Sequence, residues 1–62
     1  MILKDYHMRD IRLTDTDNDV FVGKAYFCDK EDYETDEDGL EMRVDGEIVI
    51  FYQSDIQAIE LI

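Results

Sequence analysis

Most of the charged side chains in this 62-residue chain are carboxylates: aspartate and glutamate contribute 17 residues, and lysine and arginine only 6. Carboxylates are therefore the first candidates for chemistry. Asp15, Asp17 and Asp19 alternate as at the start of a calcium-binding loop, where such oxygens converge on a hard cation. That loop needs a glycine where this chain has Val20 and a chelating residue where it has Tyr26. The spacing therefore does not predict a calcium site.

The stretch Asp29–Asp38 lies between two strand-like segments and is acidic at seven of ten positions. A calcium-loop frame beginning at Glu34 finds its glycine at Gly39, but it starts with the wrong residue and runs into a strand. Weak cation binding is one interpretation, and a solvated acidic loop is the simpler one. We predict no metal site and a charged tip for a basic partner. The tip residues are Asp32, Glu34, Asp36, Glu37 and Asp38.

The other chemically active residues are too isolated to form a catalytic or zinc site. His7 is the only histidine and Cys28 the only cysteine, and no second nitrogen or sulfur ligand lies at metal-binding spacing. Ser54 is interpreted as the cap of a helical turn and not as a nucleophile. General acid catalysis by a carboxyl group needs a dry cleft, for which so small a domain has little room. We predict no enzyme activity and no cofactor.

Aromatic side chains near the acidic residues suggest a protein interface, because interfaces combine aromatic residues with a charged rim. The candidate interface residues are Tyr26, Val49, Phe51 and Tyr52. The alternative is that Phe51 and Tyr26 complete the hydrophobic core, and size alone does not separate these two interpretations.

The length suits one domain, residues 1–62, and a domain of about 60 residues buries only roughly 60% of its unfolded surface. Help from self-association is therefore expected. The single cysteine excludes an internal disulfide and favours a reducing compartment. No apolar run approaches the roughly 20 residues that span a bilayer, and the amino terminus lacks a signal-peptide pattern. We expect a cytoplasmic protein.

Apolar and polar residues alternate over five segments, as they do in half-buried β-strands, and no proline interrupts them. One turn of helix is predicted within Met1–His7. The predicted strands are Asp10–Thr14, Val20–Cys28, Leu40–Val44, Glu47–Tyr52 and Ala58–Ile62. The fourth strand is apolar on both faces, so it is either fully buried or meets a partner with one face.

The connections between these strands indicate a small barrel. Asp15–Asp19 is rich in turn-forming residues, and Asp45-Gly46 is a typical two-residue type I′ hairpin turn. Gly23, inside the second strand, predicts a bulge or a sharp bend and places Phe21 and Ala25 on one face. Five short, bent antiparallel strands bury their apolar faces most economically as a closed or nearly closed barrel.

With this order of elements the chain resembles the Sm-like family of small barrels, particularly its short bacterial members. The spacing of the family's first motif is matched by Phe21, Gly23, Ala25, Cys28 and Asp29, and the end of its second motif by Ile56 and Ile59. The order of elements is shared with SH3-like barrels. The resemblance implies a five-stranded Sm-like or SH3-like barrel over the whole chain. It also implies rings or other oligomers in which the fourth strand of one copy joins the fifth strand of the next.

The chain departs from the RNA-binding members of that family. Those members hold a base and its phosphate with an asparagine shortly after the motif aspartate, and with a basic residue and a glycine before the last strand. This chain has Tyr33 near the first position and Tyr52-Gln53 at the second. The missing phosphate ligand and the net charge of −11 argue against a nucleic acid as partner.

We therefore expect a non-enzymatic Sm-like or SH3-like interaction module that forms homo-oligomers through its fourth and fifth strands and offers its acidic tip to a basic protein. The alternative is an acidic inhibitor or nucleic-acid mimic, of the type that phages and mobile elements use against basic nucleic-acid-binding proteins. Electrostatic steering would make such binding strongly salt-sensitive. A third interpretation is an atypical Sm-like RNA binder in which a tyrosine stacks on a base.

Overall fold

The alternation predicted for the first strand is present in the structure, a computed structural model that describes residues 1–62. Within β1 (Arg9–Asp15), Ile11 and Leu13 are fully buried, while Arg12 between them is exposed. One face of the strand therefore points to the core and the other to solvent, as a period of two residues requires.

Four further strands and two short 3₁₀ turns complete the fold, and the predicted all-β class is confirmed. The other elements are η1 (Leu3–Tyr6), β2 (Val20–Cys28), β3 (Gly39–Val44), β4 (Glu47–Tyr52), η2 (Gln53–Asp55) and β5 (Ile56–Leu61). The bounds of β2 and β4 match their predictions, whereas β5 begins two residues before Ala58 because Ile56 already belongs to the strand. No helix is long and apolar enough to cross a bilayer.

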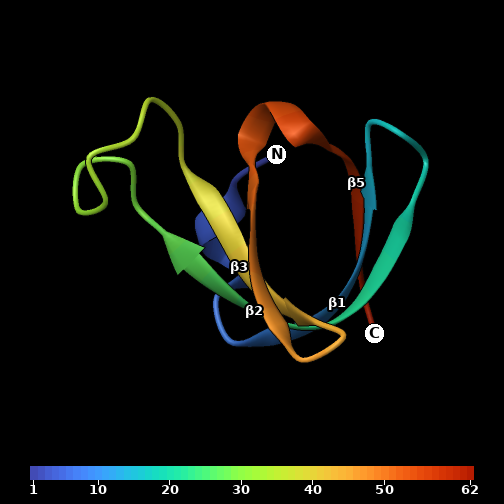
Figure 1. The fold of residues 1–62 in the computed structure, drawn as a ribbon. Helices are drawn as coiled ribbons and strands as arrows, with labels where there is room; N and C mark the ends of the chain where they lie inside the picture. The colour runs from blue at the N-terminus through green and yellow to red at the C-terminus, as the bar shows by residue number, and fades with distance from the viewer.

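The five strands form one antiparallel sheet in the order β4-β3-β2-β1-β5 (Figure 1). The sheet is not closed, so the closed form of the predicted closed or nearly closed barrel is wrong: β4 and β5 do not pair and each keeps one free edge. The ribbon shows a sheet that curves round the core without meeting itself. The short η2 carries the chain from the end of β4 across to β1, where β5 forms its ladder, so nothing brings β4 and β5 side by side.

Gly23 does not mark a bulge. The register of β1 and β2 runs through the pair Ile11 and Gly23 without a shift. The irregularity that the sheet does contain lies in the pairing of β1 with β5, between Thr14 and Asp15. The bulge predicted at Gly23 is therefore absent from β2.

The long β2 strand instead passes from one half of the sheet to the other. It pairs with β1 over 20–25 and with β3 over 25–28, so Ala25 has a partner on both sides. Residues 20–24 have no partner in β3, so the two strands are separated over the part of β2 that precedes Ala25. The change of partner from β1 to β3 therefore falls at Ala25, two residues after Gly23.

The β3–β4 hairpin confirms its predicted turn. Asp45 and Gly46 have φ angles of 51° and 82°, and a type I′ turn needs positive φ at both central positions. Glycine adopts this conformation without steric cost, and Val44 and Glu47 pair directly beside the turn.

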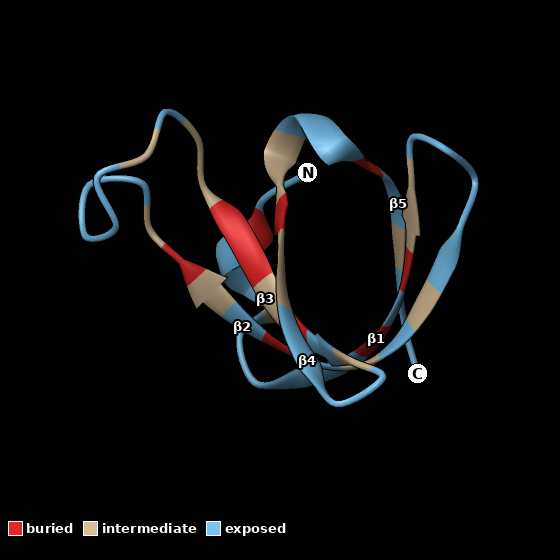
Figure 2. Cartoon of the chain, in the orientation of Figure 1, coloured by how far each residue is buried: buried red, intermediate tan, exposed pale blue.

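One hydrophobic cluster fills the space enclosed by the curved sheet and η1 (Figure 2). Its buried members are Leu3, Ile11, Leu13, Ala25, Leu40, Met42, Phe51 and Ile56. The rings of Phe21 and Phe51 pack with their centroids 4.8 Å apart, and no polar side chain is buried. Leu3 joins this cluster, which explains why so short a 3₁₀ turn is held in place.

Of the pair Ser54-Asp55 that was predicted to cap a helical or 3₁₀ turn, Asp55 takes part in capping η2 and Ser54 does not. Asp55 Oδ2 accepts a hydrogen bond of 3.2 Å from the backbone N–H of Tyr52, so a carboxylate three residues ahead satisfies the start of the turn. The Ser54 side chain turns instead to Glu37.

Candidate functional site

The predicted acidic tip is a folded segment, which we call the acidic loop (Asp29–Asp38). Asp29 Oδ1 accepts a hydrogen bond of 2.8 Å from the backbone N–H of Glu31. Asp38 Oδ1 accepts one of 2.9 Å from the backbone N–H of Lys30. These two carboxylates shape the loop from within, as aspartates commonly do in turns.

Glu37 fixes the base of the acidic loop to η2. Its Oε1 accepts a hydrogen bond of 2.7 Å from the backbone N–H of Ser54, and its Oε2 accepts one of 2.8 Å from the Ser54 hydroxyl. The carbonyl of Asp38 accepts a further bond of 2.9 Å from the backbone N–H of Gln53. The loop is therefore a braced projection from the sheet.

Four carboxylates of the acidic loop form no hydrogen bond within the chain, and all four residues are exposed: Glu31, Asp32, Glu34 and Asp36. Figure 2 shows this part of the chain extending away from the sheet. Of the five predicted tip residues, Asp32, Glu34 and Asp36 are thus free to contact a partner, while Glu37 and Asp38 hold the loop in shape.

Cys28, at the end of β2, is buried and unsuited to nucleophilic chemistry. Burial raises the pKa of the Cys28 thiol, and this outweighs the opposing hydrogen bond from Tyr33. The pKa of Tyr33 is raised as well, chiefly because a Cys28 thiolate would repel a phenolate beside it. A thiol of raised pKa is largely protonated near neutral pH and reacts slowly.

The predicted interface residues divide between the two faces of the sheet. Phe51 is 6% exposed and belongs to the core, and Val49 packs against the same cluster. Tyr26 is 41% exposed, and Tyr52, which is half-buried, faces away from the core. The structure therefore does not join these four residues in one surface.

The free edge of β4 is apolar and has unpaired backbone groups. Hydrogen-bonded pairs alternate in an antiparallel ladder, and the two-residue turn makes Val44 and Glu47 a bonded pair. The backbone N–H groups of Ile48 and Ile50 therefore point away from β3. Ile48 is 61% exposed.

The free edge of β5 has the same character. The backbone N–H of Ile62 donates to the carbonyl of Asp10 in β1, so alternation directs the N–H groups of Ile59 and Leu61 to the outside. Leu61 is 52% exposed. The molecule thus presents two unpaired strand edges, one at each end of the sheet.

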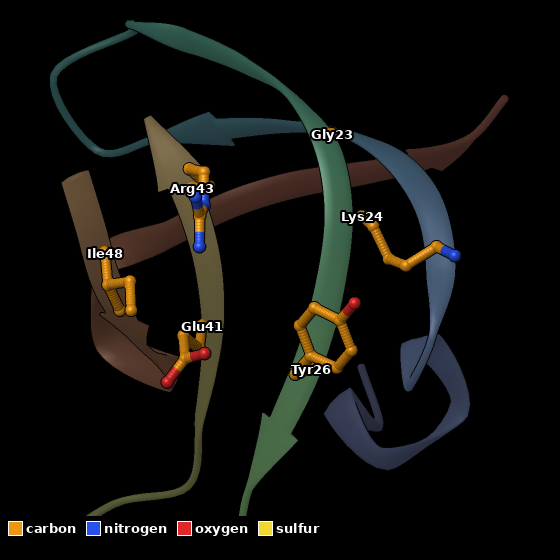
Figure 3. Close-up of a pocket in the computed structure, with 6 residues that line it drawn as sticks. All are labelled: Gly23, Lys24, Tyr26, Glu41, Arg43 and Ile48. Carbon is orange, nitrogen blue, oxygen red and sulfur yellow. The ribbon is translucent and has the colours of Figure 1, made fainter. Parts of the chain in front are cut away.

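A hollow of about 450 Å³ lies on the outer face where β2 and β3 separate, and we call it the β2–β3 hollow (Figure 3). Its lining residues are Gly23, Lys24, Tyr26, Glu41, Arg43 and Ile48. Arg43 also lines an adjoining hollow of about 290 Å³ beside Val20 and Val22. These two valines and Ile48 are more than half exposed, so the outer face here is partly apolar.

The Asp15, Asp17 and Asp19 carboxylates lie within 4.8 Å of one another. Asp15 Oδ1 accepts hydrogen bonds from the backbone N–H groups of Asp17 and Asp19, at 3.0 and 2.9 Å. These bonds explain the cluster as a turn between β1 and β2, which agrees with the prediction for this segment.

Comparison with known proteins identifies no relatives: no protein-family model matches the chain, and no curated protein or solved structure is significantly similar to it. The functional interpretation therefore depends on the geometry above. Sequence analysis missed the β2–β3 hollow, although Lys24, Tyr26 and Arg43 all occupy outward-facing positions of their strands. It also missed the link between Glu37 and Ser54, because nothing in the sequence signals a contact between two loops.

Proposed function

We propose that this protein is a non-enzymatic interaction module of the Sm-like or SH3-like kind, which self-associates when the β4 edge of one copy pairs with the β5 edge of the next. The strand order β4-β3-β2-β1-β5 supports this proposal, because it leaves these two strands at the edges, as the resemblance implies. The motif residues Phe21, Gly23 and Ala25 occupy the core-facing side of β2.

The observation that carries the proposal is that the unpaired backbone groups of both edges belong to apolar residues, and neither edge strand contains proline. The register irregularity of β5 lies at its start, before Ala58. Natural edge strands are usually blunted by proline, bulges or inward-pointing charges, because unpaired N–H and C=O groups recruit other strands. The six residues of β4 contain no proline and one charged residue, Glu47, which lies beside the turn. On β5, the outward-directed backbone groups belong to the apolar residues Ile59 and Leu61.

Pairing of two different edges has a definite geometric consequence. The contact is heterologous, so repeated addition gives a ring if the rotation closes and a filament if it does not. Each added copy also buries exposed side chains such as Ile48, which helps a domain of about 60 residues that buries little surface alone.

Sedimentation velocity over a range of concentrations tests the proposal. We expect the wild-type chain to form oligomers, and Ile48→Pro to dissociate them, because proline removes an outward N–H without removing a β3–β4 bond. Ile48→Thr is the matched control, since it keeps the N–H and a β-branched side chain, and should retain association. Leu61→Pro tests the other edge. A wild-type chain that stays monomeric at every concentration contradicts the proposal.

The exposed carboxylates favour a second candidate function, that of an acidic inhibitor or nucleic-acid mimic. Glu31, Asp32, Glu34 and Asp36 form a braced anionic projection without internal partners, and such a group can occupy a basic groove of another protein. Pull-down of a basic protein, followed by neutralisation of these four residues to Gln and Asn, tests this function. Unchanged affinity and salt dependence would rule it out.

A further inference from the structure

The β2–β3 hollow carries positive side chains in a chain whose net charge is −11. Lys24 and Arg43 both line it, and Glu41 is the one acidic residue in its lining. The structure contains a single ion pair, Arg12 with Glu60 at 3.5 Å, so neither Lys24 nor Arg43 is paired with a carboxylate. With two cations and one carboxylate the lining has a net positive charge, and Asp10 is the cross-strand neighbour of Lys24.

The side chains are arranged so that an anionic group can enter. Figure 3 shows Arg43 on β3 and Tyr26 on β2, one on each side of the hollow. Lys24 extends from β2 toward β1, and its long side chain can turn back across the rim. The exposed surfaces of Ile48 and Tyr26 add apolar contact area.

The chain itself supplies a ligand of matching chemistry. The acidic loop has four exposed carboxylates without intramolecular partners, and among them Glu34 has a positive φ of 54°, which places it at a tight turn. The same loop is tied to η2 by Glu37 and Asp38, so it is held as a preformed projection. A preformed ligand loses little conformational freedom on binding.

We infer that the β2–β3 hollow of one copy receives the tip of the acidic loop of a second copy, so that Glu34 and Asp36 meet Arg43 and Lys24. This inference rests on the proposed self-association and gives the acidic loop its basic partner. Two chains of charge −11 repel each other at long range. A contact that joins the negative loop of one to the positive hollow of the other offsets this repulsion and fixes the relative orientation of the copies.

Charge reversal on both sides of the contact tests the inference by sedimentation velocity. The hollow variant Lys24→Glu/Arg43→Glu and the tip variant Glu34→Lys/Asp36→Lys should each weaken self-association at least about tenfold, because like charges would then face each other. An equimolar mixture of the two variants should recover association between unlike chains, since each supplies the charge that the other lacks. Circular dichroism checks that both variants fold.

Lys4→Glu/Arg9→Glu is the matched control, because it changes the net charge by the same amount as the hollow variant and lies outside the hollow. It should weaken association much less. If the hollow variant associates as strongly as this control, or if the mixture recovers nothing, the loop–hollow contact is overturned while the edge pairing stands. A monomeric wild-type chain would instead overturn the edge pairing, and this contact with it.

Discussion

Glu37 and Ser54 lie on two separate connections, and the carboxylate of the first accepts both the backbone N–H and the hydroxyl of the second, at 2.7 and 2.8 Å. The pair joins the acidic loop to η2, which connects the two edge strands, β4 and β5. The Glu37 carboxylate thus helps Asp29 and Asp38 to set the position of the remaining charges of the loop.

Glu37→Gln should destabilise the domain by about 1 kcal/mol, because hydrogen bonds to a charged acceptor are the stronger kind but this pair is partly solvated. For a domain of this size such a loss corresponds to a fall in Tm of about 4–8 °C. Thermal unfolding followed by circular dichroism measures it. Glu34→Gln removes the same charge from a residue without hydrogen bonds, and its Tm should stay at or above that of the wild type.

His7→Ala should release the end of β2 locally. His7 Nδ1 accepts a hydrogen bond of 3.0 Å from the backbone N–H of Phe27, which lies beyond the last β1 partner in β2. Its loss should cost about 1 kcal/mol and speed hydrogen exchange of the Phe27 amide. Lys4→Ala, within the 3₁₀ turn that precedes His7, should leave that exchange rate unchanged. Equal acceleration in both variants would show that η1 as a whole, and not this bond, protects the amide.

The glycines should differ in how well they tolerate alanine. A Cβ at Gly39 would lie 2.9 Å from Ile50 Cγ2 and 3.1 Å from the Phe51 carbonyl, so Gly39→Ala should cost about 1–3 kcal/mol by overpacking. Gly46→Ala meets no neighbour but has φ of 82°, which predicts a cost of about 1 kcal/mol. At Gly23 the nearest atom is 3.8 Å away, so Gly23→Ala should be close to neutral.

Urea unfolding of the three alanine variants ranks them. A severe loss of stability for Gly23→Ala would show that β2 needs glycine for its backbone conformation, since there is room for a Cβ at this position.

Stability should fall as the pH rises above about 9, the ordinary pKa of a cysteine thiol. Burial raises the pKa of Cys28 in the folded chain, so the unfolded chain loses its thiol proton first. The contribution of Cys28 to stability is complete below the pKa of its thiol in the unfolded chain. It is lost as the pH rises through the pKa of the thiol in the folded chain. Comparing Tm from pH 8 to pH 10.5 in wild type and Cys28→Ala measures the effect of Cys28 together with that of Tyr33, because the raised pKa of Tyr33 depends chiefly on Cys28. Parallel curves of Tm against pH for the two proteins would contradict this prediction.

Local patterns predicted the strands well because each depends on neighbouring residues alone. The alternation of Ile11 and Leu13 and the turn at Asp45-Gly46 specify conformations without reference to the rest of the chain. Closure of the sheet was not predictable in this way, since it depends on whether two distant edges approach each other. Gly23 shows the same limit, because a glycine in a strand signals several geometries and the register decides among them.

The negative charge of the candidate site could be predicted from the sequence, but the different roles of its acidic residues could not. Composition identifies the acidic loop, yet it cannot tell Glu37, which braces the loop, from Glu34, which is free. The β2–β3 hollow lies where β2 pairs with β1 but not yet with β3, so no continuous sequence pattern predicts it.

The pairing of β5 with β1 also bears on how the chain folds. The β3–β4 hairpin joins residues that are adjacent across a two-residue turn, whereas Ile11 and Leu61 meet from opposite ends of the chain. Because closing a long loop costs more entropy than closing a short one, we expect the hairpin to order early and β5 to dock last. Substitutions in β5 should then mainly quicken unfolding, while those at Asp45-Gly46 should slow refolding.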